Sequence, residues 1–292
     1  MFDQALITKN KSRSALHVKN SDFFRFVRAD LIDRLGPIDR VYEDILWIGC
    51  RHPELDSGSR ETKVMPHEIL HCVQDDGLGF QDDGAVVQDK KFDLIYFPFG
   101  LQWIDDVQKF LRRVRALLKD EGIFICNFPG AGSLAHLRKT LFLAEEVCNQ
   151  PHSPHISPFI KFDDLASLLQ QAGFAENIMD YEHLFLEYDS PIALMKELKK
   201  VGESNALVSR SHYSITKSMY KFLSNCHPSL LCHPSLLCHP REGGDPEKNK
   251  KLDSRDSRGN DSRPFQDQVN LITLISCQTK HSIKLKSEYF TK

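Results

Sequence analysis

The feature that most constrains the fold is a strand–helix–strand unit in the middle of the chain. Residues 92–97 (FDLIYF) and 123–128 (IFICNF) are short and almost continuously apolar, which is typical of strands in a parallel sheet covered on both faces. Between them, a stripe of apolar residues with helical spacing follows Asp105 and Asp106, a pair that can cap a helix. The pattern predicts a βαβ unit, whose crossover is right-handed almost without exception.

Further helices and strands alternate on both sides of this unit. The other predicted helices are 22–35, 133–147, 163–173, 190–198 and 214–223, and the other predicted strands are 44–48, 184–188 and 269–275. Such an alternation predicts a doubly wound α/β sheet, which binds ligands outside the carboxyl ends of its strands. We therefore look for a site at residues 48–51 and 97–103.

Two segments do not fit this alternation. The first, 51–84, and the second, 226–264, resemble translated repeat elements, and the second begins with copies of Cys-His-Pro at residues 226, 232 and 238. Residues 241–263 mix charges of both signs and have Leu252 as their only large apolar side chain, so they cannot bury enough surface to offset the entropy of ordering. We interpret both as insertions into one domain formed by 1–50 (a helix and the first strand), 85–225 and 265–292 (the last strand and a tail).

A metal site is not expected. Residues 67–71 (HEILH) match the zinc-binding pattern H-E-x-x-H, but Pro66 precedes them, and Asp75 and Asp76 interrupt the helix that the pattern needs. The copied Cys-His pairs are explained by repeat expansion rather than by ligand geometry. The sequence therefore predicts no bound metal.

Charge and hydropathy exclude other classes of protein. The 38 basic and 40 acidic residues give a formal net charge of -2, which argues against a dedicated nucleic-acid binder. No stretch reaches the roughly 18 to 20 apolar residues of a membrane span, and the first residues lack the apolar core of a secretory signal. We expect a soluble cytoplasmic protein whose 8 cysteines are reduced.

Several motifs occur in one order along the chain. They are 101–106 (LQWIDD), 118–124 (LKDEGIF), 133–138 (SLAHLR), 153–159 (SPHISPF) and 201–207 (VGESNAL). Together they resemble the methyltransferase-like family that contains a mitochondrial assembly factor of respiratory complex I, and more distantly the malonyl-carrier-protein methyltransferase of biotin synthesis. The resemblance implies a Rossmann-like class I methyltransferase fold, S-adenosylmethionine as cofactor, and a protein substrate such as a complex I subunit, which is methylated or hydroxylated on arginine.

The resemblance also implies the cofactor-binding residues. Gly49 and Cys50 match the glycine-rich turn after the first strand, although Trp47 stands where the family usually has Asp and Arg51 replaces a further Gly. The remaining cofactor residues are Asp93, Gln102 and Trp103. Asp93 either contacts the ligand or supports its strand, and Trp103 either covers an apolar ligand face or fills the core.

Polar residues of the family motifs are candidates for the acceptor side. His155, in a loop with several prolines, can act as an acid or base, or can hydrogen-bond a loop carbonyl. Arg138 can anchor a carboxylate, or can pair on the surface with Glu145 or Glu146. The departures at Trp47 and Arg51 leave two alternatives to catalysis open, namely a non-catalytic scaffold with the methyltransferase fold and a decaying gene whose product barely folds.

Overall fold

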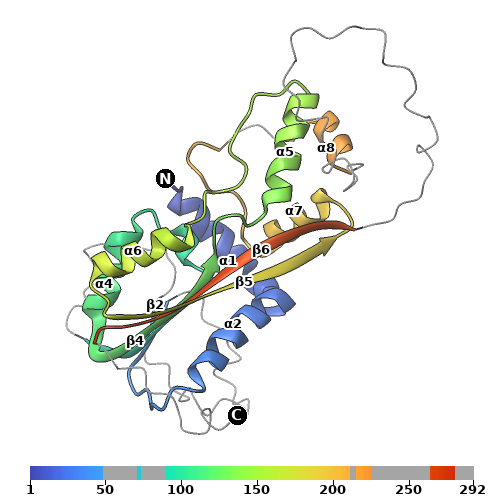
Figure 1. Ribbon diagram of the computed structural model, residues 1–292. Coiled ribbons are helices and arrows are strands. Elements are labelled where there is room, and N and C mark those ends of the chain that lie inside the picture. Colours follow the sequence, from blue (N-terminus) through green and yellow to red (C-terminus); the bar gives the residue numbers. More distant parts are fainter. Residues whose placement is uncertain (49–70, 74–89, 211–214, 225–263, 280–292) are drawn as a thin grey trace, which may run out of the picture.

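The computed structural model describes residues 1–48, 71–73, 90–210, 215–224 and 264–279 (Figure 1). Its six-stranded sheet has the order β2-β1-β3-β4-β6-β5. The strands are β1 Ile45–Ile48, β2 His71–Val73, β3 Phe92–Pro98, β4 Leu118–Pro129, β5 Glu176–Tyr188 and β6 Phe265–Cys277. The helices are α1 Gln4–Asn20, α2 Asp22–Leu35, α4 Val107–Leu117, α5 Ala135–Val147, α6 Phe162–Ala172, α7 Pro191–Lys200 and α8 Lys217–Ser224, with a 3-10 turn, η1, at Leu101–Trp103.

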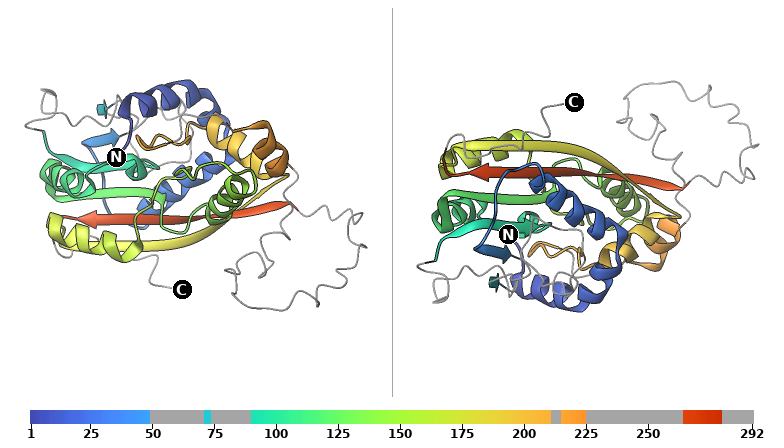
Figure 2. Two further views of the ribbon diagram at one scale, coloured as in Figure 1. Left: turned by 90° about the horizontal axis from the view of Figure 1, so that it is seen from above. Right: turned by 90° about the horizontal axis from the view of Figure 1, so that it is seen from below.

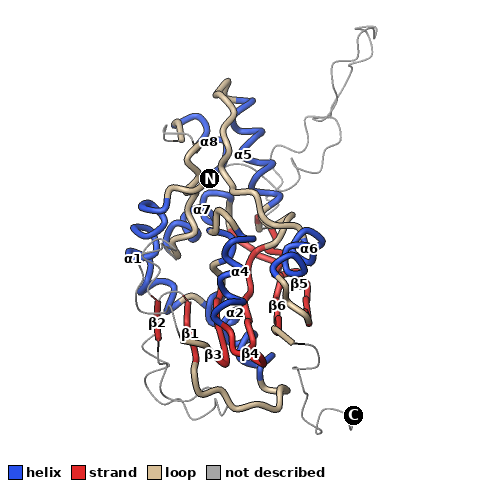
Figure 3. The backbone as a smooth tube through the Cα atoms, turned by 90° about the vertical axis from the view of Figure 1, so that its left-hand side faces the viewer, coloured by secondary structure: helices blue, strands red, loops and turns tan. Residues whose placement is uncertain are grey.

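The sheet confirms the predicted doubly wound α/β fold. β1 pairs in parallel with β2 and β3, and β3 pairs in parallel with β4. β6 is antiparallel to both of its neighbours, so the last described strand lies between β4 and β5. Helices α4 and α6 cover one face of the sheet and α2 covers the other (Figures 1 and 3).

Side chains of the central strands alternate between two cores, as the period of two in a strand requires. In β3, for example, Ile95 and Phe97 pack toward α4 and α6, whereas Leu94 and Tyr96 pack toward α2. All four are fully buried. This explains why residues 92–97 are apolar throughout instead of alternating with polar residues.

β5 and β6 extend beyond the rest of the sheet. Their pairing continues to Tyr188 and Phe265, whereas β4 ends opposite Leu271. Helices α5, α7 and α8 pack over this two-stranded extension, as the views in Figures 1 and 2 show. The extension therefore makes a second packing platform at the carboxyl end of the parallel strands.

α1 is an element that the sequence analysis missed. It has no wide apolar stripe, and only Ile7 and Ser14 are buried among its residues. Asp3 begins it by accepting a hydrogen bond from the Leu6 amide, and Lys11 ties it to Glu203 by an ion pair of 3.0 Å. Polar contacts thus dock this helix, which a search for apolar periodicity does not detect.

Much of the two segments interpreted as insertions lies outside the described residues. β2 belongs to the first segment, yet its backbone pairs with β1, and His71 of the zinc-like pattern begins this strand. The division into domain and insertions remains a prediction. Within the described part of the chain, no cluster of His, Cys, Asp and Glu could hold a metal ion, and no helix is long and apolar enough to cross a membrane.

Candidate functional site

A cavity of about 620 Å³ lies where the parallel strands β3 and β4 end. Phe99 and Pro129 line it at these two strand ends, and other walls come from α5, α7, the loop at 153–159 and the start of α2. Its position agrees with the rule that open α/β sheets bind ligands at the carboxyl ends of their strands. Among the predicted site residues, Gln102, Trp103 and His155 all line this cavity.

Gln102 and Trp103 are held at one side of the cavity by Glu203. Its carboxylate accepts hydrogen bonds from Trp103 Nε1 at 3.0 Å and from Gln102 Nε2 at 3.3 Å, and Lys11 neutralises it. Trp103 also packs edge-on against Phe2, with ring centroids 5.4 Å apart. Glu203, part of the motif at 201–207, thereby fixes two predicted ligand residues.

The side-chain oxygen of Gln102 accepts no hydrogen bond from the described residues. Its Nε2 donates to Phe99 O at 3.2 Å and to Glu203, whereas its buried Oε1 has no hydrogen-bond donor among the described residues. Turning the amide around would place the oxygen against two acceptors, so the orientation is fixed. Leaving such an atom without a partner costs about 1–3 kcal/mol, and a ligand that donates a hydrogen bond here would recover this.

His155 forms a pair with a buried carboxylate. Its Nε2 lies 2.6 Å from Glu145 Oε1, and Glu145, near the end of α5, is only 3% exposed. Burial disfavours the ionised form of this carboxyl, but hydrogen bonds from His155, His152 and Ser153 outweigh it, so the pKa of Glu145 is lowered. An ionised Glu145 requires a proton on His155 Nε2, which leaves Nδ1 as the acceptor in the neutral ring.

Sequence reasoning missed the role of Glu145, because ten residues separate it from His155. It named Glu145 only as a possible surface partner of Arg138. One sequence signal could have revealed it: Glu145 lies on the same side of the predicted helix as the apolar residues Leu141 and Ala144, and both of these are buried in the structure. A charged residue in such a position needs a partner in the fold.

A carboxylate from β6 holds the beginning of α5. Asp267 accepts hydrogen bonds from the amides of His136 and Leu137, at 3.3 and 2.8 Å, in the first turn of the helix. Burial raises the pKa of Asp267, and these amide contacts oppose the rise. Because α5 carries Glu145 in its last turn, Asp267 helps to position the pair with His155.

The motifs at 153–159 and 201–207 meet at the cavity. Asn205 Nδ2 donates to Pro154 O at 2.6 Å, and Ser157 and Ser204 line the cavity nearby. Gly202, with φ of 80°, allows α1 to approach, since a Cβ at this position would lie 2.4 Å from Ser14 Oγ. The two motifs are separate in the sequence, but they form neighbouring walls of one cavity.

Arg138 does not lie in this cavity. Its Nη2 donates to Ser157 O at 3.2 Å from the outer side of the loop, and its side chain lines a separate hollow of about 500 Å³. No described ion pair joins it to Glu145 or Glu146. Arg138 therefore braces the loop that carries His155, and the structure does not bring the two predicted catalytic residues together.

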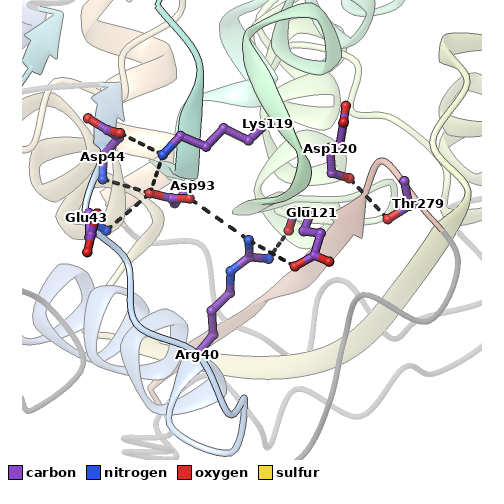
Figure 4. Close-up of polar contacts among 8 residues, drawn as sticks. All are labelled: Arg40, Glu43, Asp44, Asp93, Lys119, Asp120, Glu121 and Thr279. Atoms are coloured by element: carbon purple, nitrogen blue, oxygen red, sulfur yellow. Dashed lines mark hydrogen bonds and ion pairs between the residues drawn. The ribbon is translucent and has the colours of Figure 1, made fainter.

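Asp93 lies at the opposite end of the sheet, at the beginning of β3 (Figure 4). Its carboxylate accepts hydrogen bonds from the amides of Glu43 and Asp44 and pairs with Lys119 at 2.9 Å. Burial opposes its ionisation, but these contacts lower the pKa of Asp93. Five residue steps of about 3.3 Å separate it from Pro98, so Asp93 supports its strand and does not reach the cavity.

The turn after β1 cannot be placed, because Gly49 and Cys50 lie outside the described residues. Trp47, just before them, packs in the core on the α2 side, with its ring centroid 4.4 Å from that of Tyr96. Its side chain therefore points away from any ligand at the strand ends. Two carboxylates, Asp75 and Asp76, follow β2 in the sequence but are also outside the described residues.

The described part of the site fits S-adenosylmethionine at two points. Gln102, whose Oε1 has no donor among the described residues, lines the cavity and can hydrogen-bond the amino or hydroxyl groups of that cofactor, and Trp103 and Phe99 line the cavity beside it. Gln102 and Trp103 are thus the described residues that would hold the cofactor.

Comparisons with known proteins agree with this geometry. A family model described as a methyltransferase domain matches residues 22–177. The chain is 40% identical, over 75% of its length and 78% of the relative's, to a putative methyltransferase RP459 from Rickettsia prowazekii. It is 36% identical to the mitochondrial arginine-hydroxylase NDUFAF5 from Homo sapiens, over 72% of this chain and 65% of that one.

A third relative is the malonyl-[acyl-carrier protein] O-methyltransferase from Nitrosospira multiformis, with 31% identity over 44% of this chain and 40% of that protein. The chain thus spans slightly less than two thirds of the human relative and under half of this third relative. All three matches agree with the resemblance drawn from the sequence motifs.

Proposed function

Because this chain belongs to the family of methyltransferase domains, we propose that it is an S-adenosylmethionine-dependent methyltransferase that acts on a protein substrate linked to respiratory complex I. The observation that carries the enzymatic part is the Glu145–His155 pair, whose histidine lines a cavity at the carboxyl ends of the parallel strands. The link to complex I is supported by the family resemblance of the motifs at 153–159 and 201–207.

The pair of side chains suits the removal of a proton from the acceptor. Glu145 holds the His155 ring and fixes its proton on Nε2, so that Nδ1 can accept a proton from an acceptor hydroxyl or amine. Glu145 then stabilises the imidazolium that forms. When bound, the cofactor supplies the methyl group, and the protein's part is to align the acceptor with it.

Location and reaction type also belong to the proposal. A cytoplasmic location is supported by the free thiols of Cys126, Cys148 and Cys277 among the described residues. Hydroxylation of arginine is the alternative reaction, supported by the name of the mitochondrial relative. A non-catalytic scaffold is the alternative of another class, and it is supported by Trp47, whose side chain packs in the core.

The proposal is tested by cofactor binding followed by transfer. Calorimetry on the purified chain should show saturable binding of S-adenosylmethionine, and Gly49→Arg, which changes the glycine that the family resemblance assigns to the cofactor, should abolish it. Methyl transfer to co-purified complex I subunits, followed with a labelled methyl group, should then depend on His155. Absence of binding heat at millimolar cofactor would rule out methyl transfer, and cofactor-independent capture of the same subunits would establish the scaffold instead.

A further inference from the structure

Part of the cavity is walled by apolar side chains from two helices and two strands. We call it the α5–α7 chamber. None of its residues is charged, and all belong to or pack against a single hydrophobic cluster: Leu134 just before α5, Leu137 and Leu141 of α5, Leu186 and Tyr188 of β5, Val269 of β6, and Leu194, Met195 and Leu198 of α7.

Several chamber residues keep apolar surface open. Leu186, Tyr188, Met195 and Leu198 are only partly buried, although they pack against the cluster and line the cavity. A cavity of about 620 Å³ falls within the roughly 300–1,000 Å³ of ordinary ligand sites. Covering this surface with an apolar ligand strengthens binding about fourfold for each buried methylene.

The carboxylates that line the cavity already have cationic partners. Glu203 pairs with Lys11 at 3.0 Å, Glu197 pairs with Lys200 at 3.3 Å, and Asp22 pairs with Arg25. A guanidinium group taken from water into the cavity would need a carboxylate of its own. None of these carboxylates belongs to the α5–α7 chamber, so the chamber itself offers no counter-ion to an arginine side chain.

We propose that the chamber selects an acceptor whose body is apolar and uncharged, such as an alkyl, acyl or aromatic group, and that it disfavours an arginine side chain. This inference rests on the proposed function, because it treats the chamber as the acceptor side of that site. The apolar group can be carried by a free lipid-like molecule or by a protein substrate. His155, at the same cavity, then meets the reacting group of the acceptor.

A series of straight-chain alcohols tests the chamber without any cofactor. Calorimetric titration with hexanol, octanol and decanol should show affinity rising about fourfold per methylene until the chamber is full. Met195→Trp, which fills the chamber, should weaken decanol binding at least tenfold, whereas the matched variant Met195→Leu should change it less than threefold. Leu198→Trp provides a second block if Met195→Trp fails to unfold cooperatively.

Competition identifies the source of the apolar group. Blocked tripeptides centred on norleucine or on arginine are added to the decanol complex. Displacement by the norleucine peptide supports a group carried on a protein, and displacement by neither peptide supports a free lipid-like acceptor. Affinity that does not depend on alcohol length, or displacement by the arginine peptide at equal or lower concentration, would overturn the proposal. Since these titrations need no S-adenosylmethionine, failure of cofactor binding is seen separately.

Discussion

The two ends of the central strands use polar side chains in opposite ways. At the amino end, Asp93 and Asp44 share Lys119, and Asp93 also accepts from two backbone amides (Figure 4). At the carboxyl end, within the described part of the chain, the buried oxygen of Gln102 has no donor and only Nε2 of the His155 ring has a hydrogen-bond partner. Both ends contain charged and polar residues, but the cavity and the histidine of the Glu145–His155 pair lie at the carboxyl end.

This difference separates stability from function. A network whose donors and acceptors are all paired stabilises the fold, but it has no group left to bind a ligand. A buried polar group without a partner costs stability, and in a ligand site it gains its partner when the ligand binds. Asp93, predicted to bind the cofactor, belongs to the first kind. The following predictions test the division from the largest expected effect to the smallest.

His155→Asn should lower the rate of methyl transfer about 100-fold to 10,000-fold, the usual contribution of a general base. The free energy of unfolding should also fall, by about 1–3 kcal/mol, because the buried Glu145 carboxylate loses its nearest hydrogen-bond donor, so rates are compared on folded protein. The matched control is His152→Asn, which removes another histidine that contacts Glu145 but does not line the cavity. Equal losses of rate in both variants would show that methyl transfer depends on the hydrogen bonds to Glu145 in general and not on His155 as the base.

Asp93→Ala should lower the free energy of unfolding by about 1–3 kcal/mol, since it leaves two backbone amides without their acceptor and leaves Lys119 with Asp44 alone. Below the unfolding transition, cofactor affinity should stay at the wild-type value. Urea denaturation combined with calorimetry measures both quantities. A loss of cofactor affinity in a fully folded variant would return Asp93 to the ligand site.

Asp93→Asn should also make stability less dependent on acid pH. The pKa of Asp93 is lowered in the folded chain, so the unfolded chain binds more protons between that pKa and about 4, and stability falls as the pH decreases through this window. One such carboxyl contributes at most about 1.4 kcal/mol per pH unit. Urea midpoints between pH 3 and 7 should decline less steeply in the variant, and parallel curves would contradict the assignment.

Arg138→Ala should have the smallest effect, a loss of activity of less than about tenfold, because it removes one hydrogen bond to a loop carbonyl. Arg138→Lys should keep about half of the activity, because a lysine side chain can still donate a hydrogen bond to Ser157 O. If Arg138 instead anchored a substrate carboxylate with both of its amino groups, both variants would lose far more, and KM would rise.

The predictable parts of this protein are those that apolar patterning determines. The helix at 22–35 and the strands around 92–97 and 123–128 lie where their periodicity placed them, and β5 and β6 proved longer than their apolar segments. α1 was not predicted, because ion pairs and caps dock it. The antiparallel placement of β6 depends on its pairing with strands that are distant in sequence, which no local pattern records.

The site was partly predictable for the same reason. Gln102 and Trp103 could be found from the rule about strand ends, and His155 from its motif. The Glu145–His155 pair requires α5 and the 153–159 loop to be placed in space. For Asp93 the sequence left two roles open, contact with the ligand or support of its strand, and its contacts at the beginning of β3 favour the second.

The central claim is that ligands bind at the carboxyl end of the sheet and not at its amino end. Calorimetric titration of S-adenosylmethionine into the wild type, Gln102→Leu and Asp93→Asn tests it most directly. The account predicts binding by the wild type, at least about tenfold weaker binding by Gln102→Leu from the loss of one hydrogen bond, and unchanged binding by Asp93→Asn. Full affinity in Gln102→Leu together with lost affinity in folded Asp93→Asn would contradict it.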